Sequence, residues 1–195
     1  MTPPRETTRL QDPSAHDPAR WRARFPILAD TTYLVTHSLG AMPNTVREKL
    51  AQFTELWATR GVRAWAEGWW DSPSWVGDLV AKLLNAPPGS VVMHQNVSMI
   101  QAVIASALDF SGPRNTVVYT EQEFPSVMYV WEALKRQGAR IECVRGESAV
   151  GVSNERLLAA IDERTKIVPI SHVCFRTAFL QDAAAVVKRA HEGGA

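Results

Sequence analysis

Residues 116–144 read TVVYTEQEFPSVMYVWEALKRQGARIECV, in which two short apolar runs flank a helical pattern. The runs at residues 116–120 and 141–144 contain β-branched side chains and predict strands. Between them, apolar residues recur at helical spacing over residues 127–134 and predict a helix. Two strands joined by a helix run parallel, because only a crossover connection returns the chain to the same end of a sheet. The stretch therefore predicts an α/β fold.

The same alternation extends in both directions along the chain. Further helices are predicted over residues 45–60, 76–84, about 98–108, about 155–161 and 182–191, and further strands over residues 32–35, 90–93 and 166–171. Strands that alternate with helices of this length indicate a largely parallel sheet with flanking helices. In the first of these helices, Val46, Leu50 and Phe53 belong to an apolar stripe, which predicts a buried face.

Length and charge bound the class of protein. At about 150 residues per domain, 195 residues correspond to one domain or slightly more. Residues 1–25 hold four of the twelve prolines, which predicts a flexible N-terminal arm before a domain over residues 26–195. A net charge of +1 favours neither nucleic acid nor an anionic membrane as a partner. No apolar run reaches the roughly 18 residues that a membrane-spanning helix needs.

The two cysteines, Cys143 and Cys174, are isolated in sequence and form no paired motif. A disulfide framework and a structural zinc site are therefore both disfavoured. The first 25 residues contain no apolar segment of the kind found in secretion signals. We therefore expect a cytoplasmic protein with no nucleic-acid, membrane or metal partner.

Five of the seven tryptophans fall between Trp57 and Trp75. A single surface helix does not need so many large rings. One interpretation is an aromatic cluster at a contact between subunits or domains. The other is a wall of a substrate pocket, and the sequence leaves both open.

Three loops follow predicted strands, at the edge of a parallel sheet where ligands bind. The loop at residues 94–98 ends in Ser98, which either caps the next helix or contributes to a phosphate site there. The loop at residues 121–126 carries Phe124, either a core residue or a ring that stacks on a flat ligand. The loop at residues 171–177 contains a hydroxyl, an imidazole and a guanidinium. Together they predict a site for a phosphorylated, planar ligand.

These loops resemble those of the class V aminotransferase family, whose members are pyridoxal 5'-phosphate (PLP) enzymes of fold type I. The segments that carry the resemblance are His37-Ser-Leu-Gly40, Asn96-Val-Ser98, Phe124-Pro-Ser126 and Ser171-His-Val173, with Thr177 and Asp182. Within the family the chain is most similar to kynureninases. The resemblance implies the large domain of a three-layer α/β fold, of which residues 26–195 are the N-terminal part, and it implies a homodimer.

The resemblance also implies roles for individual residues. The cofactor-binding residues are Val97 and Ser98 at the phosphate, Phe124 on the pyridine ring, Ser126 in the same pocket and Ser171 near the cofactor. Ser38 and His37 are the candidate substrate-binding residues.

This sequence departs from the kynureninase pattern mainly in segments that bear on the substrate. His37 stands where the kynureninase loop has asparagine, Val127 where it has aspartate and Ala178 where it has glycine. Residues 61–70 lack the histidine that kynureninases carry after the first long helix.

PLP chemistry needs a lysine that forms a Schiff base and an acid partner for the pyridine nitrogen. Of the five lysines, four fall in predicted helices, and Lys166 begins a predicted strand at the edge opposite the three loops. We therefore expect no catalytic residue within this chain. It is interpreted as a truncated N-terminal part of a longer enzyme, inactive by itself, with its lysine and aspartate further along.

The predicted activity of the whole enzyme on its small amino-acid substrate is kynureninase-like hydrolysis of kynurenine to anthranilate and alanine. A cysteine desulfurase, a selenocysteine lyase or a transaminase of the same family is the alternative. A non-enzymatic binding module is the prediction if the natural chain ends at Ala195. A nucleotide-binding domain is disfavoured, because the sequence has neither a GxGxxG motif nor a P-loop.

Overall fold

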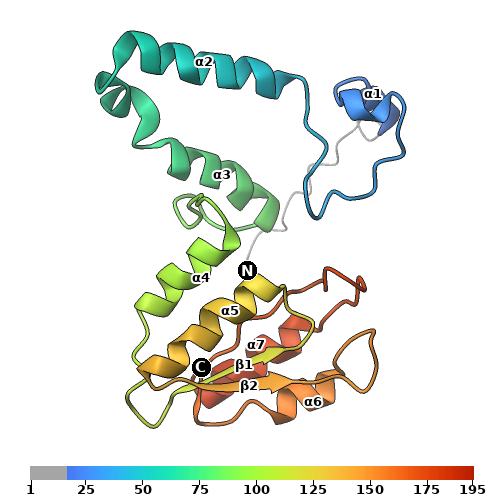
Figure 1. The fold of residues 1–195 in the computed structure, drawn as a ribbon, viewed down its shortest axis with the longest axis vertical. Coiled ribbons are helices and arrows are strands. Elements are labelled where there is room, and N and C mark those ends of the chain that lie inside the picture. The colour runs from blue at the N-terminus through green and yellow to red at the C-terminus, as the bar shows by residue number, and fades with distance from the viewer. Residues whose placement is uncertain (1–16) are drawn as a thin grey trace, which may run out of the picture. The chain divides into compact units, whose positions relative to one another are not determined.

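The computed structural model describes residues 17–195 (Figure 1). The chain divides into two compact units, Met1–Ser72 and Pro73–Ala195. We describe each unit by itself, and the assignment of residues 26–195 to one domain stays a prediction.

The second unit contains a three-stranded parallel sheet with strand order β2-β1-β3. The strands are β1 (Thr116–Thr120), β2 (Arg140–Val144) and β3 (Thr165–Ile167). Thr116 lies opposite Arg140 and Thr120 opposite Val144, so β1 and β2 pair along their whole length. The central strand β1 is buried at every position, as expected for a strand covered on both faces.

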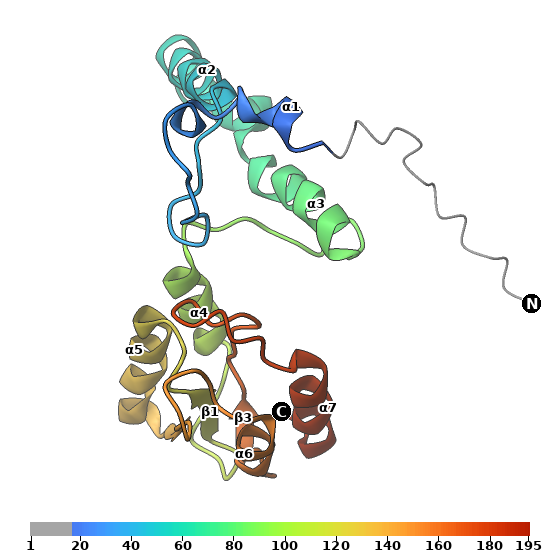
Figure 2. The same cartoon turned by 90° about the vertical axis from the view of Figure 1, so that its right-hand side faces the viewer.

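Helices cover both faces of this sheet (Figure 2). On one side lies α5 (Pro125–Ala133), with α4 (Val97–Ser106) packed along it. On the other side lie α6 (Asn154–Ala159) and α7 (Ala183–Gly193). The predicted three-layer α/β architecture is therefore confirmed.

The pleat of β1 divides the hydrophobic core into two clusters. Val117 and Tyr119 pack with Trp131 of α5, whereas Val118 packs with Leu157 of α6 and with α7. Successive side chains of a strand point to opposite faces, so a single five-residue run supplies both cores.

Two predicted strands are absent from the described residues, because neither run has a neighbouring strand. Residues 32–35 form no ladder, and Leu34 is 78% exposed. Residues 90–93 instead lie along α3 (Ser72–Leu84), where the Met93 amide donates to the Pro73 carbonyl at 3.1 Å. The close approach depends on Gly77, since a Cβ there would lie 1.9 Å from the Val91 carbonyl oxygen.

The regular secondary structure of the first unit is helical over the described residues, and a non-helical segment spans residues 31–44. The unit contains α1 (Ala19–Arg22), a 3-10 helix (Pro26–Leu28), α2 (Thr45–Arg60) and a π-helical turn (Trp65–Trp69). Residues 1–16 of the predicted arm lie outside the part of the chain that the structure describes. Residues 17–25 of the arm contain α1.

The apolar stripe of α2, predicted to be buried, is largely exposed. Leu50, Phe53 and Trp57 are all exposed, and no residue of the helix is buried. Ala64 is the one buried residue among positions 17–72, so this unit has too little core to cover the stripe. The helix bounds were right and the burial was wrong.

Aromatic rings of the first unit contact one another around the π-helical turn. Phe53 stacks on Trp69 with ring centroids 4.6 Å apart, and Trp65 lies 4.8 Å from Trp70. Trp75 belongs to α3, beyond the boundary between the units. The two interpretations of the tryptophan cluster, a contact surface and a pocket wall, both stay predictions.

Candidate cofactor-binding site

A buried glutamate joins the loops that follow β1 and β3. Glu123 is 3% exposed, and its Oε1 accepts from the Ser171 amide at 2.9 Å. Its Oε2 accepts from the Ser171 hydroxyl at 2.6 Å, and Thr120 Oγ1 lies 3.4 Å from Oε1. Ser171, a predicted cofactor residue, is thereby fixed beside the loop that carries Phe124, another predicted cofactor residue.

A second glutamate joins the loop after β2 to the same edge. Glu121 Oε1 accepts from the Gly146 amide at 2.8 Å, and the Glu121 amide donates to the Val144 carbonyl at 3.0 Å. The loops that follow all three strands are therefore connected at the carboxyl edge of the sheet, where ligands bind in folds of this kind.

The loop after β3 continues into a closed hairpin whose tip reaches Phe124. A bridge pairs Val173 with Leu180, and the Cys174 amide donates to the Phe179 carbonyl at 2.9 Å. From the tip, the Phe175 ring meets the Phe124 ring edge to face, with centroids 4.9 Å apart. Phe124 is 51% exposed, so it is not a core residue and its ring is available to a ligand.

The hairpin holds Ala178 in a left-handed backbone conformation, with φ of +58°. This is the position where the resemblance implies glycine. A side chain in this region is strained by about 1–2 kcal/mol, and the entropy that glycine loses on folding offsets part of the gain. We predict that Ala178→Gly raises the free energy of unfolding by about 0.5–1 kcal/mol in urea denaturation.

Ala133→Gly, at an exposed position of helix α5, is the matched control for that change. It should lower the free energy of unfolding by about 1 kcal/mol. A loss of stability in Ala178→Gly would contradict the strain argument.

Of the two roles that the sequence leaves open for Ser98, the structure excludes the helix cap. Asn96 is the N-cap of helix α4, and its Oδ1 accepts from the Met99 amide at 2.9 Å. Ser98 is the second residue of the helix. Within the described chain, the amides of Val97 and Ser98 and the Ser98 hydroxyl have no hydrogen-bond partner.

Helix α5 begins in the same way, directly after the loop from β1. Pro125 occupies its first position, and neither the amide nor the hydroxyl of Ser126 is hydrogen bonded to any residue that the structure describes. Helices α4 and α5 lie side by side with their N-termini toward the same end (Figures 1 and 2). Trp131 Nε1 donates to Gln101 Oε1 at 2.7 Å and links them.

These donors have the chemistry of an anion site. Free amides at a helix N-terminus carry positive partial charge, and hydroxyls add further donors for phosphate oxygens. Val97, Ser98 and Ser126 supply such donors, and Phe124 supplies an exposed ring. This donor set fits a phosphorylated, planar ligand such as PLP, and the roles of the individual residues stay predictions.

Sequence reasoning missed two residues of this site, Glu123 and Phe175. A glutamate between a strand end and Phe124 was visible in the sequence, but its partner Ser171 lies 48 positions away. No local sequence pattern predicts a hydrogen bond between residues so far apart in the chain. Phe175 lies among polar residues of its loop, and no sequence pattern distinguishes it as a site residue.

The candidate substrate residues lie in the first unit. His37 and Ser38 belong to an exposed turn, where the Ser38 amide donates to the Val35 carbonyl at 3.2 Å. Their role toward a substrate stays a prediction.

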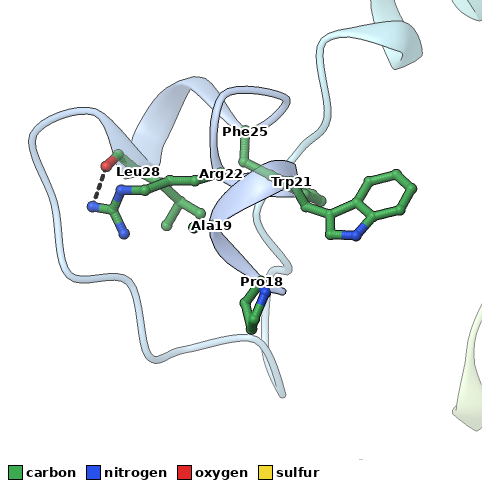
Figure 3. A pocket seen from close by; sticks show the side chains of 6 residues that line it. All are labelled: Pro18, Ala19, Trp21, Arg22, Phe25 and Leu28. Atoms are coloured by element: carbon green, nitrogen blue, oxygen red, sulfur yellow. Dashed lines mark hydrogen bonds between the residues drawn. The ribbon is translucent and has the colours of Figure 1, made fainter. Parts of the chain in front are cut away.

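A pocket in the first unit is lined by the residues of helix α1 and the segment after it (Figure 3). Its one charged side chain, Arg22, donates to the Leu28 carbonyl. None of the predicted site residues lines this pocket, so we do not assign it a role in the candidate site.

Burial makes the two thiols poor nucleophiles. Burial, and secondarily Glu123, raises the pKa of Cys174, while burial and Glu121 raise that of Cys143. Since the thiolate is the reactive form, we predict that iodoacetamide at pH 8 alkylates Cys174 on the order of tenfold more slowly than glutathione. Mass spectrometry of the peptide that contains Cys174 measures this rate, and equal rates would refute the prediction.

Within residues 17–195 no helix has the length and apolarity that a membrane span needs. Across the same residues, no group of three or more histidine, cysteine, aspartate or glutamate side chains is arranged to hold a metal ion.

Comparison with known proteins gives consistent matches. The model of the family "Aminotransferase class-V" matches residues 33–195. A kynureninase from Pseudomonas fluorescens is 31% identical over 184 residues, which cover 89% of this chain and 42% of that protein. The chain spans less than half the length of the curated relatives it matches.

Solved structures share the fold. A variant of C-DES with glycine covalently linked to its PLP cofactor matches 88% of this chain and 46% of its own, with a TM-score of 0.74 and 17% identity. A cysteine desulfurase from Thermococcus onnurineus NA1 matches 91% of this chain and 46% of its own, with a TM-score of 0.73 and 19% identity. The family match over most of the chain, together with this fold, shows that the chain belongs to the class V aminotransferase family.

Proposed function

We propose that this chain supplies the phosphate-binding part of a PLP-dependent enzyme that acts on a small amino acid. PLP is the cofactor of the family to which the chain belongs. The observation that carries the proposal is the pair of helix N-termini at the carboxyl edge of the sheet. Their unpaired donors at Val97, Ser98 and Ser126 suit a phosphate dianion, with Phe124 beside them for the ring.

When bound, PLP withdraws electrons from the substrate carbon that loses a bond. The residues of this chain contribute binding and orientation. The donors of α4 and α5 hold the phosphate, the exposed Phe124 ring limits the cofactor's tilt, and Ser171 contacts it from the loop after β3. Because the phosphate is one end of the cofactor, holding it would fix the position of the reactive end.

We further propose kynureninase-like hydrolysis, which yields anthranilate and alanine from kynurenine. The support is the 31% identity to a kynureninase over most of this chain. The test incubates the protein at its natural length with PLP and, in turn, kynurenine, cysteine with a thiol reductant, selenocysteine with the same reductant, and kynurenine with a 2-oxo acid as amino-group acceptor. Anthranilate with alanine supports the proposal, whereas alanine with sulfide or selenide, or a keto acid, would assign it to the desulfurase, selenocysteine lyase or transaminase activities.

The buried Cys174 does not suit the persulfide chemistry of a desulfurase, because burial raises its pKa and the loop around it is closed by hydrogen bonds. A desulfurase would therefore need a cysteine from outside this loop.

Covalent attachment of PLP to this 195-residue chain is not expected. In the second unit, Lys82 and Lys188 lie in helices α3 and α7, Lys135 lies in a helical turn, and Lys166 lies in β3. None of the four is in a loop at the carboxyl edge. We predict that borohydride treatment of the chain with PLP leaves no lysine adduct at a defined position, as measured by peptide mass spectrometry. A single stoichiometric adduct would contradict this.

The homodimer and the cytoplasmic location remain part of the same proposal. Sedimentation of the protein at its natural length tests the first, and fractionation of cells tests the second.

A further inference from the structure

We propose that Glu123 is the positioning residue of this site, a buried carboxylate that sets the orientation of Ser171 and the placement of Phe124 toward the cofactor. This inference rests on the proposed function. It adds a residue that does not itself contact the ligand and that determines how two contacting residues are presented.

Two hydrogen bonds hold the Glu123 carboxylate to Ser171. One oxygen accepts from the Ser171 amide at 2.9 Å, with Thr120 Oγ1 at 3.4 Å, and the other accepts from the Ser171 hydroxyl at 2.6 Å. Two bonds from one residue fix both the distance and the rotation of the Ser171 loop relative to the β1 loop. A single bond would leave the serine side chain free to change rotamer.

Burial makes this arrangement costly to disturb. A carboxylate taken out of water must have hydrogen-bond partners, or its desolvation is not compensated. Among the described residues Glu123 forms no ion pair, so its partners are the neutral donors of Ser171 and Thr120. Removal of the carboxylate therefore leaves the Ser171 donors without partners and frees both loops.

The carboxylate also decides which way the Ser171 hydroxyl points. Because that hydroxyl donates its proton to Glu123, it presents only lone pairs to a ligand. Ser171 is then an acceptor for a donor group on the cofactor. If glutamine replaces Glu123, its amide can donate to Ser171 Oγ, and the hydroxyl proton is released toward the ligand. Replacing one buried carboxylate oxygen by an amide nitrogen thus changes the Ser171 hydroxyl from a hydrogen-bond acceptor toward the ligand into a donor.

Phe124 is held from two directions. Its backbone follows Glu123 directly, and its ring is contacted by Phe175 from the hairpin that begins at Ser171. The second support depends on the Glu123–Ser171 connection, because these bonds hold the start of the hairpin beside the β1 loop. Loss of Glu123 should therefore loosen the ring as well as the serine.

The test measures PLP binding by calorimetry in the protein at its natural length, for wild type, Glu123→Gln, Glu123→Ala, Ser171→Ala and the double variant Glu123→Ala/Ser171→Ala. Visible circular dichroism of the bound cofactor reports its orientation, and thermal melting reports folding. Glu132→Gln is the matched control, since this glutamate of helix α5 accepts from Tyr119 of β1 and pairs with Lys135, outside the site.

We expect Glu123→Ala to raise the dissociation constant for PLP on the order of tenfold or more. The effects of Glu123→Ala and Ser171→Ala on the dissociation constant should multiply to more than the effect of the double variant, because each change removes the same hydroxyl–carboxylate bond. Glu123→Gln should melt near wild type and still change the circular dichroism of the bound cofactor, and Glu132→Gln should change neither affinity nor spectrum.

Unchanged affinity and unchanged spectrum in folded Glu123→Gln would overturn the inference, even if Glu123→Ala failed to fold. Effects of Glu123→Ala and Ser171→Ala that multiply in the double variant would also overturn it. If wild type binds no PLP, the proposed function itself fails. If wild type binds and the variants bind equally, only the role of Glu123 fails.

Discussion

Ser98→Asp is expected to abolish PLP binding while leaving the fold at least as stable as wild type. Ser98 is the second residue of α4, where its amide and hydroxyl have no partner among the described residues. A carboxylate near the N-terminus of a helix is favourable, so helix α4 should gain stability. The same carboxylate would repel a phosphate by about 4 kcal/mol at 4 Å near a protein surface, which corresponds to a loss on the order of 10³-fold in affinity.

Ser98→Asn is the matched control, because asparagine has the shape of aspartate without its charge. It should weaken PLP binding far less than Ser98→Asp does. Calorimetry gives the two dissociation constants, and urea denaturation checks the stability. Equal affinities in the Asp and Asn variants would place the phosphate somewhere other than the start of α4.

Trp131→Ala is expected to lower the free energy of unfolding by about 3–5 kcal/mol. Trp131 is completely buried, and it packs against Val117 and Tyr119 of β1. Its Nε1 donates to Gln101 Oε1 at 2.7 Å, so the substitution also removes a hydrogen bond between α4 and α5. The expected loss is comparable to the whole stability of a small domain, so the second unit should be largely unfolded at 37 °C.

Tyr129→Ala, on the exposed side of the same helix, is the control for helix propensity. It should change the free energy of unfolding by no more than about 0.5 kcal/mol. Urea denaturation monitored by far-ultraviolet circular dichroism gives both values. A loss below about 1 kcal/mol in Trp131→Ala would contradict the assignment of Trp131 to the core.

The parts of the fold that depend on local pattern were predictable from the sequence. Strand β1 has the predicted bounds, β2 begins one residue earlier than predicted, and α2 matches its prediction of residues 45–60. In these segments, side-chain type and spacing agree with the structure that the tertiary contacts favour.

The predictions were wrong where the structure of a segment depends on which other segment packs against it. Residues 32–35 and 90–93 have strand-like composition, but a strand forms only beside another strand. The predicted strand over residues 166–171 is shorter in the structure, where β3 ends at Ile167 and the chain turns toward Glu123. The stripe on α2 had the correct period, but a period does not show what covers a face.

The loops of the candidate site were predictable from the sequence, whereas the hydrogen bonds that connect these loops were not. Phe124, Ser126 and Ser171 lie at the carboxyl edge, as the strand order required. Asn96 rather than Ser98 caps α4, because the helix begins at Val97, one residue before the predicted start at about residue 98. Glu123 escaped notice because its contacts join distant parts of the chain.

The central claim is that the starts of α4 and α5 bind the phosphate of PLP. Calorimetric titration of the protein at its natural length with PLP, and separately with pyridoxal, tests this most directly, because pyridoxal lacks the phosphate. We predict binding of one PLP per chain and an affinity for pyridoxal lower by on the order of 10²-fold. Equal affinity for both ligands, or no binding of PLP, would contradict the account.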